Sequence, residues 1–266
     1  MVSFPPCKIN LGLQILSKQP DGYHSIVTCF YPLPWEDVLE ILPSDSLMFN
    51  QSGNPIAGKL DHNLCLRAYH LLKQDHKLPP VQIHLHKIIP AGAGLGGGSS
   101  DAAHTLRLLN AIFALELSQK ELMRYASQLG SDCAFFLKDA TMLGSGRGEI
   151  LEPVTINVKG FYLRLFNPDI HISTAEAYAN VIPKNSHVML REVIEKPVRS
   201  WKEELKNDFE NSVFAKYPIL QLIKNELYES GAVYASMSGS GSTIFGIFKD
   251  DKPGNYFIKE SWSGWL

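Results

Sequence analysis

The sequence predicts an α+β fold, and three observations support this class. Runs of strand-like alternation occur in clusters, helical stripes separate the clusters, and no regular β-α-β rhythm runs through the chain. A chain of 266 residues can form one large domain or two modest ones. We expect two domains, formed by residues 1–155 and 156–266.

The composition of the chain indicates which kinds of binding partner to expect. The chain carries 25 basic and 27 acidic residues, with no long run of either sign, so we expect no nucleic-acid or membrane partner. Four widely spaced cysteines form no CxxC pair, no apolar run is long enough to span a bilayer, and the first residues do not resemble a secretion signal. These features predict a cytoplasmic protein with reduced thiols. They do not indicate an oligomeric state.

The first elements are expected to be strands. Ile9, Leu11, Leu13 and Ile15 alternate with smaller or polar residues, which predicts a strand with one face on the core. Turn residues at 20–22 precede a returning strand over 25–33, and a further strand is expected over 38–42.

Helices and one more strand follow. The stripe over 61–74 predicts a helix capped by Asp61. Residues 81–86 alternate strictly between apolar and polar, as in a half-buried strand. A second helix is expected over 102–113, and a third opens with a capping box formed by Ser118 and Glu121 and ends at Gly130.

The C-terminal half repeats this mixture. We expect a strand over 161–166, a helix capped by Ser173 or Thr174, surface loops at 183–187 and 195–200, and helices over 209–215 and 218–230. The segment 233–248 reads as two strand-like runs joined by a glycine-rich turn.

The stretch "PAGAGLGGGSSDAA" at residues 90–103 is the strongest candidate for a binding site, with five glycines between Gly92 and Gly98. It matches GxGxxG literally, but a dinucleotide site also needs an acidic residue at a strand end about 20 residues later. That position falls near Glu116, between two expected helices. A P-loop needs Lys and Ser/Thr after its last glycine, where this chain has two serines. The pattern alone is therefore weak evidence.

The physical chemistry of this stretch favours a phosphate ligand. Glycines let several backbone N–H groups converge on an anion, and the free N–H groups and dipole of the following helix add to the attraction. The hydroxyls of Ser99 and Ser100 can donate to phosphate or bind Mg²⁺. Asp101 is expected to cap the helix or to face the metal.

The glycine stretch resembles the second motif of the GHMP small-molecule kinases, and "ASMSGSGSTIFGIF" resembles their C-terminal glycine-rich motif at Ser238–Ser242. The segments "PPCKINLGLQILSKQPDGYHSI", "LGSDCAFFL", "GRGEIL" and "NDFENSVF" are similar to one branch, whose substrate is a cytidine-diphosphate-linked methylerythritol. The resemblance extends from residue 5 to about 248. It implies an N-terminal ribosomal-protein-S5-like ATP-binding domain and a ferredoxin-like C-terminal domain, with the active site in the cleft between them.

The resemblance also implies the reaction, which is transfer of the ATP γ-phosphoryl group to the 2-hydroxyl of the methylerythritol, with Mg²⁺. Asp132 matches the general base and Lys8 the catalytic lysine of the family. An alcohol is a poor nucleophile until its proton is taken, and an ammonium favours the developing alkoxide. No side chain is assigned as a metal ligand.

Further positions carry over as binding residues. Asn10, Tyr23 and His24 match substrate-binding positions, and Tyr178 matches an aromatic that stacks on the cytosine. The residues expected at ATP are Asn63 near the adenine and the loop Pro90, Ala91, Gly92, Ala93, Gly94, Leu95, Gly96, Gly97, Gly98, Ser99 and Ser100.

Departures from the branch are small, and three alternatives remain open. Cys7 and Ala134 replace a usual Ala and Pro, and the chain ends somewhat early after "SWSGWL". The protein could be another GHMP kinase, for homoserine, mevalonate or a sugar, although those substrates have no cytosine for "DGYH" to recognise. It could be a nucleotide-binding protein of this fold that has lost catalysis, although a binder needs no base paired with a lysine. A dinucleotide enzyme is disfavoured by the missing acidic residue.

Overall fold

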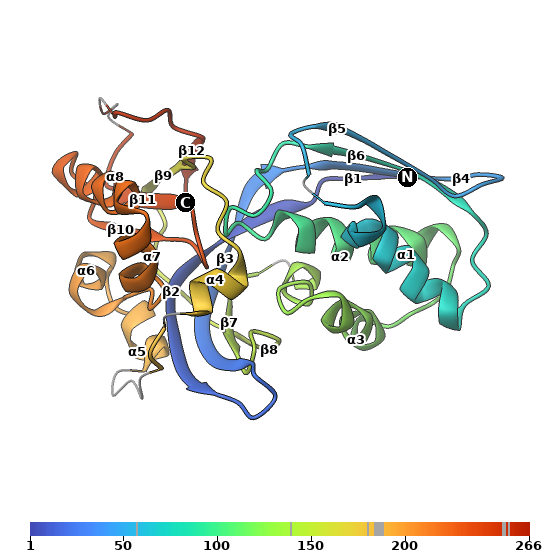
Figure 1. Ribbon diagram of the computed structural model, residues 1–266, viewed down its shortest axis with the longest axis horizontal. Coiled ribbons are helices and arrows are strands. Elements are labelled where there is room, and N and C mark those ends of the chain that lie inside the picture. The colour runs from blue at the N-terminus through green and yellow to red at the C-terminus, as the bar shows by residue number, and fades with distance from the viewer. Residues whose placement is uncertain (57, 139, 180, 184–188, 252–253, 255) are drawn as a thin grey trace. The chain divides into compact units, whose positions relative to one another are not determined.

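The computed structural model describes residues 1–56, 58–138, 140–179, 181–183, 189–251, 254 and 256–266 (Figure 1). The chain forms two compact units, which are described separately. Unit 1 comprises Met1–Lys8, Pro32–Ala91 and Gly96–Ala140, and unit 2 comprises Ile9–Tyr31, Gly92–Leu95 and Thr141–Leu266. Because each unit combines separate stretches of sequence, this division differs from a single boundary near residue 155. That boundary, and the active-site cleft expected with it, stay predictions.

Unit 1 is a four-stranded sheet with helices along one face (Figure 1). The strand order is β1-β4-β6-β5, in which β5 runs parallel to β6 and the other pairs are antiparallel. The strands are β1 (Val2–Ser3), β4 (Val38–Pro43), β5 (Met48–Gly53) and β6 (Val81–Lys87). The α-helices are α1 (Leu64–Asp75), α2 (Gly97–Ile112) and α3 (Gln119–Leu129), with short 3-10 turns at Leu60–His62 and Phe135–Leu137.

The alternation of β6 places its two faces as the sequence predicts. Val81, Ile83 and Leu85 are fully buried, whereas the side chains between them are half-buried or exposed. Lys87 continues the buried face and is only 2% exposed. The last residue on the buried face of β6 is therefore a lysine.

The helix caps of unit 1 confirm one prediction and correct another. The Ser118–Glu121 capping box at the start of α3 is present, and Gly130 ends that helix. Asp61 does not cap α1, because it lies in the 3-10 turn that precedes the helix. Asn63 takes that place, and its side chain accepts the Cys65 N–H at 2.9 Å.

Unit 2 contains two sheets and the C-terminal helices (Figure 1). One sheet has the order β2-β3-β7-β8 and the other the antiparallel order β10-β11-β9-β12. Their strands are β2 (Pro6–Lys18), β3 (His24–Glu36), β7 (Met142–Ser145), β8 (Ile150–Pro153), β9 (Tyr162–Phe166), β10 (Tyr234–Met237), β11 (Ile244–Phe248) and β12 (Trp262–Trp265), the first residues of β2 and the last of β3 belonging to unit 1. The helices are α4 (Thr174–Ala179), α5 (Leu190–Ile194), α6 (Trp201–Glu204), α7 (Glu210–Lys216) and α8 (Pro218–Glu229), with a 3-10 turn at Val198–Ser200.

The core of unit 2 forms where α7 and α8 pack on the second sheet, and it includes Leu13 and Ile15 of β2. The expectation that β2 buries one face is wrong, since every residue from Cys7 to Leu13 is buried. The second face is covered as well: a Cβ built on Gly12 would overlap the Leu205 and Leu190 side chains, and the Asn10 N–H donates to the Ser238 hydroxyl. The fold class is confirmed as α+β.

The remaining expectations concern loops and membrane spans. The predicted loop at 183–187 lies outside the described residues from 184 onward, and the loop at 195–200 contains a 3-10 turn with a buried Val198. Ser173 caps α4 by accepting the Glu176 N–H at 3.1 Å. Among the described helices, none combines the length and apolar character needed to cross a membrane.

Buried thiols give a first testable prediction. All four cysteines are free and buried, and burial raises the pKa of Cys29 and of Cys133 to about 12 and that of Cys7 and Cys65 further. Because the thiolate is the reactive form, we expect no reaction with an aromatic disulfide reagent at pH 8 in the native protein, and four reactive thiols in denaturant. Rapid labelling of any native thiol would contradict the packing described for these residues.

Candidate functional site

The structure brings together the two residues that the sequence nominated for catalysis. The Lys8 ammonium lies 3.3 Å from a carboxylate oxygen of Asp132, and both residues belong to unit 1. Lys8 is buried, at 3% exposed, whereas the Asp132 side chain is 29% exposed. The pair therefore presents a carboxylate that a ligand can reach, with a buried cation behind it.

Local structure fixes each partner. Lys8 lies on β2, and Asp132 lies in the turn that follows α3, where its carbonyl accepts the Phe135 N–H at 3.2 Å. Gly96 lies against Lys8, because a Cβ built on it would be 3.0 Å from Lys8 Cε and 2.9 Å from the Phe136 ring. With φ at +72°, Gly96 also has a backbone conformation that side chains disfavour. Only glycine at this position lets the backbone pass so close to the lysine.

The start of α2 has the features of an anion site. Gly96 is the N-cap, and the N–H groups of Gly97, Gly98 and Ser99 have no acceptor within the helix. Gly98 is exposed and Ser99 is half-buried. The Ser100 hydroxyl is fully buried and finds no hydrogen-bond partner within the described part of the chain.

Asp101 does not cap α2, as one of the two expectations had it. It is the fifth residue of α2, not its cap, and it is 2% exposed. One carboxylate oxygen accepts a hydrogen bond from the Lys87 ammonium at 2.8 Å. The Asp101 carboxylate therefore points into the interior of unit 1, where Lys87 of β6 is its hydrogen-bond partner.

In unit 2, the loop segment Gly92–Leu95 packs on the C-terminal glycine-rich turn. The Ser238 hydroxyl donates to the Gly94 carbonyl at 2.9 Å, and the Thr243 N–H donates to the Ala93 carbonyl at 3.2 Å. A Cβ on Gly94 would overlap the Ser238 carbonyl oxygen. The two glycine-rich motifs therefore meet through their backbones.

Asn10 is buried in the same region of unit 2. Its amide donates to the Thr28 hydroxyl at 2.9 Å, and its backbone N–H donates to the Ser238 hydroxyl at 3.2 Å. A Cβ on Gly239 would lie 3.1 Å from the Asn10 carbonyl oxygen. Asn10 thus links β2 to the C-terminal glycine-rich turn.

The aromatic residues expected at the cytosine also lie in unit 2. The rings of His24 and Tyr178 stack at 4.5 Å with an interplanar angle of 14°. Burial, followed by the charge of Lys18, lowers the pKa of His24, which favours the neutral imidazole. Tyr23 is 56% exposed, and the Arg147 guanidinium covers its ring at 3.8 Å.

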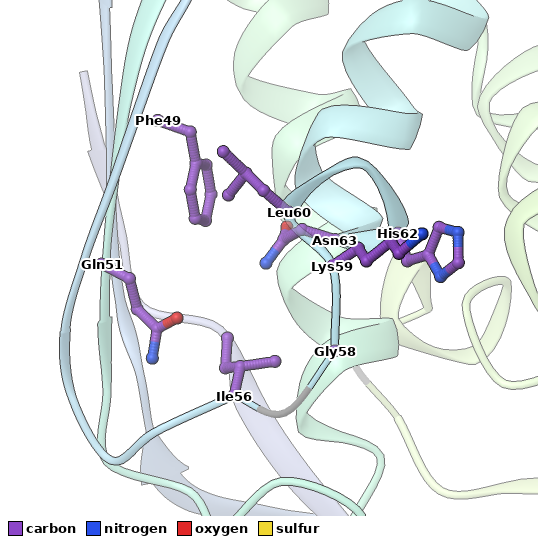
Figure 2. A pocket seen from close by; sticks show the side chains of 8 residues that line it. All are labelled: Phe49, Gln51, Ile56, Gly58, Lys59, Leu60, His62 and Asn63. Carbon is purple, nitrogen blue, oxygen red and sulfur yellow. The ribbon is translucent and has the colours of Figure 1, made fainter.

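Asn63 lies in a pocket of about 160 Å³ in unit 1 (Figure 2). The Phe49 ring and the Gln51 amide line the β5 side of the pocket, and Leu60 lies opposite them. Because the Asn63 oxygen caps α1, its amide nitrogen is the group left to donate to a ligand. The other lining residues are Ile56, Gly58, Lys59 and His62.

Sequence reasoning missed two residues that hold these elements. Arg147 also pairs with Asp21 at 2.6 Å, and its signal was the "GRGE" segment after β7. Asn207 donates to the carbonyls of Met237 and Gly239, each at 2.8 Å, and so anchors the C-terminal glycine-rich turn. Its signal is the "NDFE" segment, which is part of the family resemblance.

Comparison with known proteins adds an independent line of evidence. The family model for the GHMP kinases N terminal domain matches residues 63–139, and the model for GHMP kinases C terminal matches residues 189–258. The chain is 53% identical over 249 residues to a 4-diphosphocytidyl-2-C-methyl-D-erythritol kinase of Cytophaga hutchinsonii, covering 93% of this chain and 92% of the relative. It is 50% identical to the protein of the same name from Bacteroides fragilis, covering 95% and 93%.

Solved structures give the same result. A crystal structure of 4-(cytidine 5'-diphospho)-2C-methyl-D-erythritol kinase matches with a TM-score of 0.79 at 32% identity, covering 93% of this chain and 90% of the other. Streptococcus pneumoniae phosphomevalonate kinase, at 15% identity and a TM-score of 0.69, covers 95% and 93% and shares the fold. With both domain models matched and relatives of this identity along nearly the whole chain, the protein belongs to the GHMP kinase family.

Proposed function

We propose that this kinase transfers the γ-phosphoryl group of ATP to the 2-hydroxyl of 4-diphosphocytidyl-2-C-methyl-D-erythritol, in the non-mevalonate route to isoprenoid precursors. The names of relatives at 50% and 53% identity, and of a solved structure at 32% identity, support this substrate. The observation that carries the chemistry is the Lys8–Asp132 pair beside the glycine loop. We further propose a cytoplasmic location, which the four free thiols support.

The start of α2 is proposed to hold the phosphates of ATP. Three backbone N–H groups without helical acceptors and the positive end of the helix dipole favour an anion there. Residues Pro90–Ser100 supply the surrounding backbone, which can approach the phosphates closely. The buried Ser100 hydroxyl would gain a partner from a phosphate oxygen or a cation, which removes the cost of leaving it unpaired.

Mg²⁺ fits this donor set, which offers oxygen ligands from the phosphates and from serine hydroxyls. Within the described residues, no group of three or more His, Cys, Asp or Glu side chains could hold a metal. We therefore propose that the ion is bound chiefly through the nucleotide, with Ser99 or Ser100 as its protein contact. When bound, Mg²⁺ neutralises charge on the phosphates.

The pocket beside Asn63 is proposed to take the adenine (Figure 2). The Phe49 ring and Leu60 offer apolar walls for a planar base. The free donor of Asn63 and the amide of Gln51 offer hydrogen bonds to its edge. This combination of apolar walls with a few polar groups is typical of small-molecule sites.

Asp132 is proposed as the general base. Its carboxylate is accessible enough to accept a proton from the substrate hydroxyl, and the attacking oxygen gains nucleophilicity as that proton leaves. The Lys8 ammonium stabilises the negative charge that develops on this oxygen, and its burial keeps it in place. Phosphoryl transfer otherwise depends mainly on positioning and charge neutralisation.

His24, Tyr23, Tyr178 and Asn10 are proposed to bind the cytidylyl substrate. A neutral imidazole has one donor and one acceptor nitrogen, which suits the edge of a cytosine. The His24 ring covers one face of Tyr178, so a base can stack on that face only if the imidazole moves aside. Arg147, which is paired with Asp21, places its guanidinium over the Tyr23 ring and so holds that ring in position.

The function is tested by mixing the protein with Mg·ATP and a panel of alcohols and following ADP release. We expect turnover with the cytidylyl substrate and none with homoserine, mevalonate or galactose, because only the first offers a cytosine to His24. Turnover restricted to one of the other alcohols would assign the protein to a different GHMP branch.

Replacing the proposed base separates chemistry from binding. Asp132→Asn keeps the size of the side chain and removes its ability to take a proton. We expect the rate of phosphoryl transfer to fall by about 10²–10⁴-fold, with nucleotide affinity nearly unchanged. Single-turnover kinetics and calorimetric titration with a non-hydrolysable ATP analogue measure the two quantities. Asp45→Asn, at an exposed position of unit 1, is the matched control, and full activity of Asp132→Asn would remove Asp132 from the mechanism.

Replacing His24 tests the cytosine site. We expect His24→Ala to raise KM for the cytidylyl substrate roughly tenfold, as for the loss of one or two hydrogen bonds, and to leave KM for ATP unchanged. His70→Ala, an exposed histidine of α1, should change neither constant. Equal increases in both KM values for His24→Ala would move His24 out of the cytosine site.

A further inference from the structure

A buried ionic cluster formed by Asp37, Lys87 and Asp101 lies at both ends of the segment that carries the glycine loop. We propose that this cluster is a positioning device for the nucleotide site: it holds the first turn of α2 at the place where its N–H groups bind the phosphates. The inference rests on the proposed function, and it adds residues to which no role in the reaction has been given.

One end of the segment is fixed by Asp37. One of its carboxylate oxygens accepts the N–H groups of Ile88 and Ile89, at 2.6 and 2.9 Å, and the other accepts a hydrogen bond from the Lys87 ammonium. Asp37 is itself held to the N-terminal segment, since its N–H donates to the Pro5 carbonyl at 2.9 Å. The end of β6 and the first residues of the loop therefore share one anchor.

The other end is fixed by Asp101. Its carboxylate accepts a hydrogen bond from the same Lys87 ammonium, at 2.8 Å. The ammonium also lies directly beside the first residue of α2, because a Cβ on Gly97 would be 3.1 Å from Lys87 Nζ. A single cation thus ties the residues before the loop to the first turn of the helix after it.

The electrostatics of the cluster keep it intact. All three residues are at most 2% exposed, so each charge depends on its neighbours for compensation. Burial opposes the charged form of Lys87, but Asp101 and Asp37 raise its pKa above the ordinary value. Burial raises the pKa of Asp101 to about 7, against the lowering effect of Lys87. Movement of the Lys87 ammonium would break its hydrogen bonds to Asp37 and Asp101, and their partners would be left buried without compensation.

A buried ionic cluster could instead serve stability alone. The location indicates a further role, because the side-chain hydrogen bonds of the cluster join Ile88 and Ile89, before the proposed phosphate-binding loop, to Asp101 in the helix that follows it. Small displacements of binding groups reduce affinity and rate strongly. If the cluster sets this geometry, its disruption will weaken nucleotide binding beyond what lower stability explains.

The experiment compares Asp101→Ala with Asp101→Asn. The alanine removes the acceptor for Lys87, whereas asparagine keeps an oxygen in the same place and should rescue the geometry. We expect Asp101→Ala to raise the Kd for the magnesium complex of a non-hydrolysable ATP analogue, and KM for ATP, by about tenfold or more. KM for the cytidylyl substrate should not change, and Asp101→Asn should bind the analogue nearly as tightly as the unmodified protein.

Ile83→Val is the control, since it removes a buried methyl group from the same strand without touching the cluster. It should lower the midpoint of thermal unfolding and leave the analogue affinity unchanged. If Asp101→Ala does not fold, Lys87→Met replaces it with the same expectation.

Two results would overturn the inference: unchanged analogue affinity in Asp101→Ala, or an equal loss of affinity in Asp101→Asn. Failure of the unmodified protein to bind the analogue would count instead against the proposed function.

Discussion

The contact on which the account depends is the ion pair between Lys8 and Asp132, with its 3.3 Å separation. The Lys8 side chain is only 3% exposed, and Asp132 supplies the opposite charge beside it. The partner carboxylate remains partly accessible, so the pair holds its charges in place without closing the carboxylate to a ligand. Gly96 completes the arrangement, because its missing Cβ leaves room for the lysine beneath the loop.

In both units, glycine residues let the backbone come into direct contact with neighbouring groups. In unit 1, Gly96 passes over Lys8, and in unit 2, Gly94 packs on the Ser238 carbonyl. Each approach is then fixed by buried polar groups: Asp37 and Lys87 hold the loop of unit 1, and Asn207 holds the C-terminal turn of unit 2. Glycine supplies the space, and buried hydrogen bonds supply the rigidity that glycine lacks.

The fold and the residues of the site were predictable to different degrees. Strict alternation predicts β6, the capping box predicts α3, and the joint motifs alone indicate Lys8 and Asp132 as the catalytic residues. The sequence predicts Asp61 as the cap of α1, whereas Asn63 is the cap, because the apolar pattern of the helix does not reveal the short 3-10 turn before it. The Asp37–Lys87–Asp101 cluster was not predicted, since single charges usually lie at the surface. One signal was present: Lys87 continues the phase of the buried residues of β6.

We propose above all that Lys8 and Asp132 act together on the acceptor hydroxyl. The most direct measurement is the single-turnover rate of phosphoryl transfer in Lys8→Met, in Asp132→Asn and in the double variant, at saturating Mg·ATP. Groups that act together give non-additive losses, so the double variant should be no slower than the slower single variant. Losses that multiply in the double variant would show that the two residues act independently, and would contradict the account.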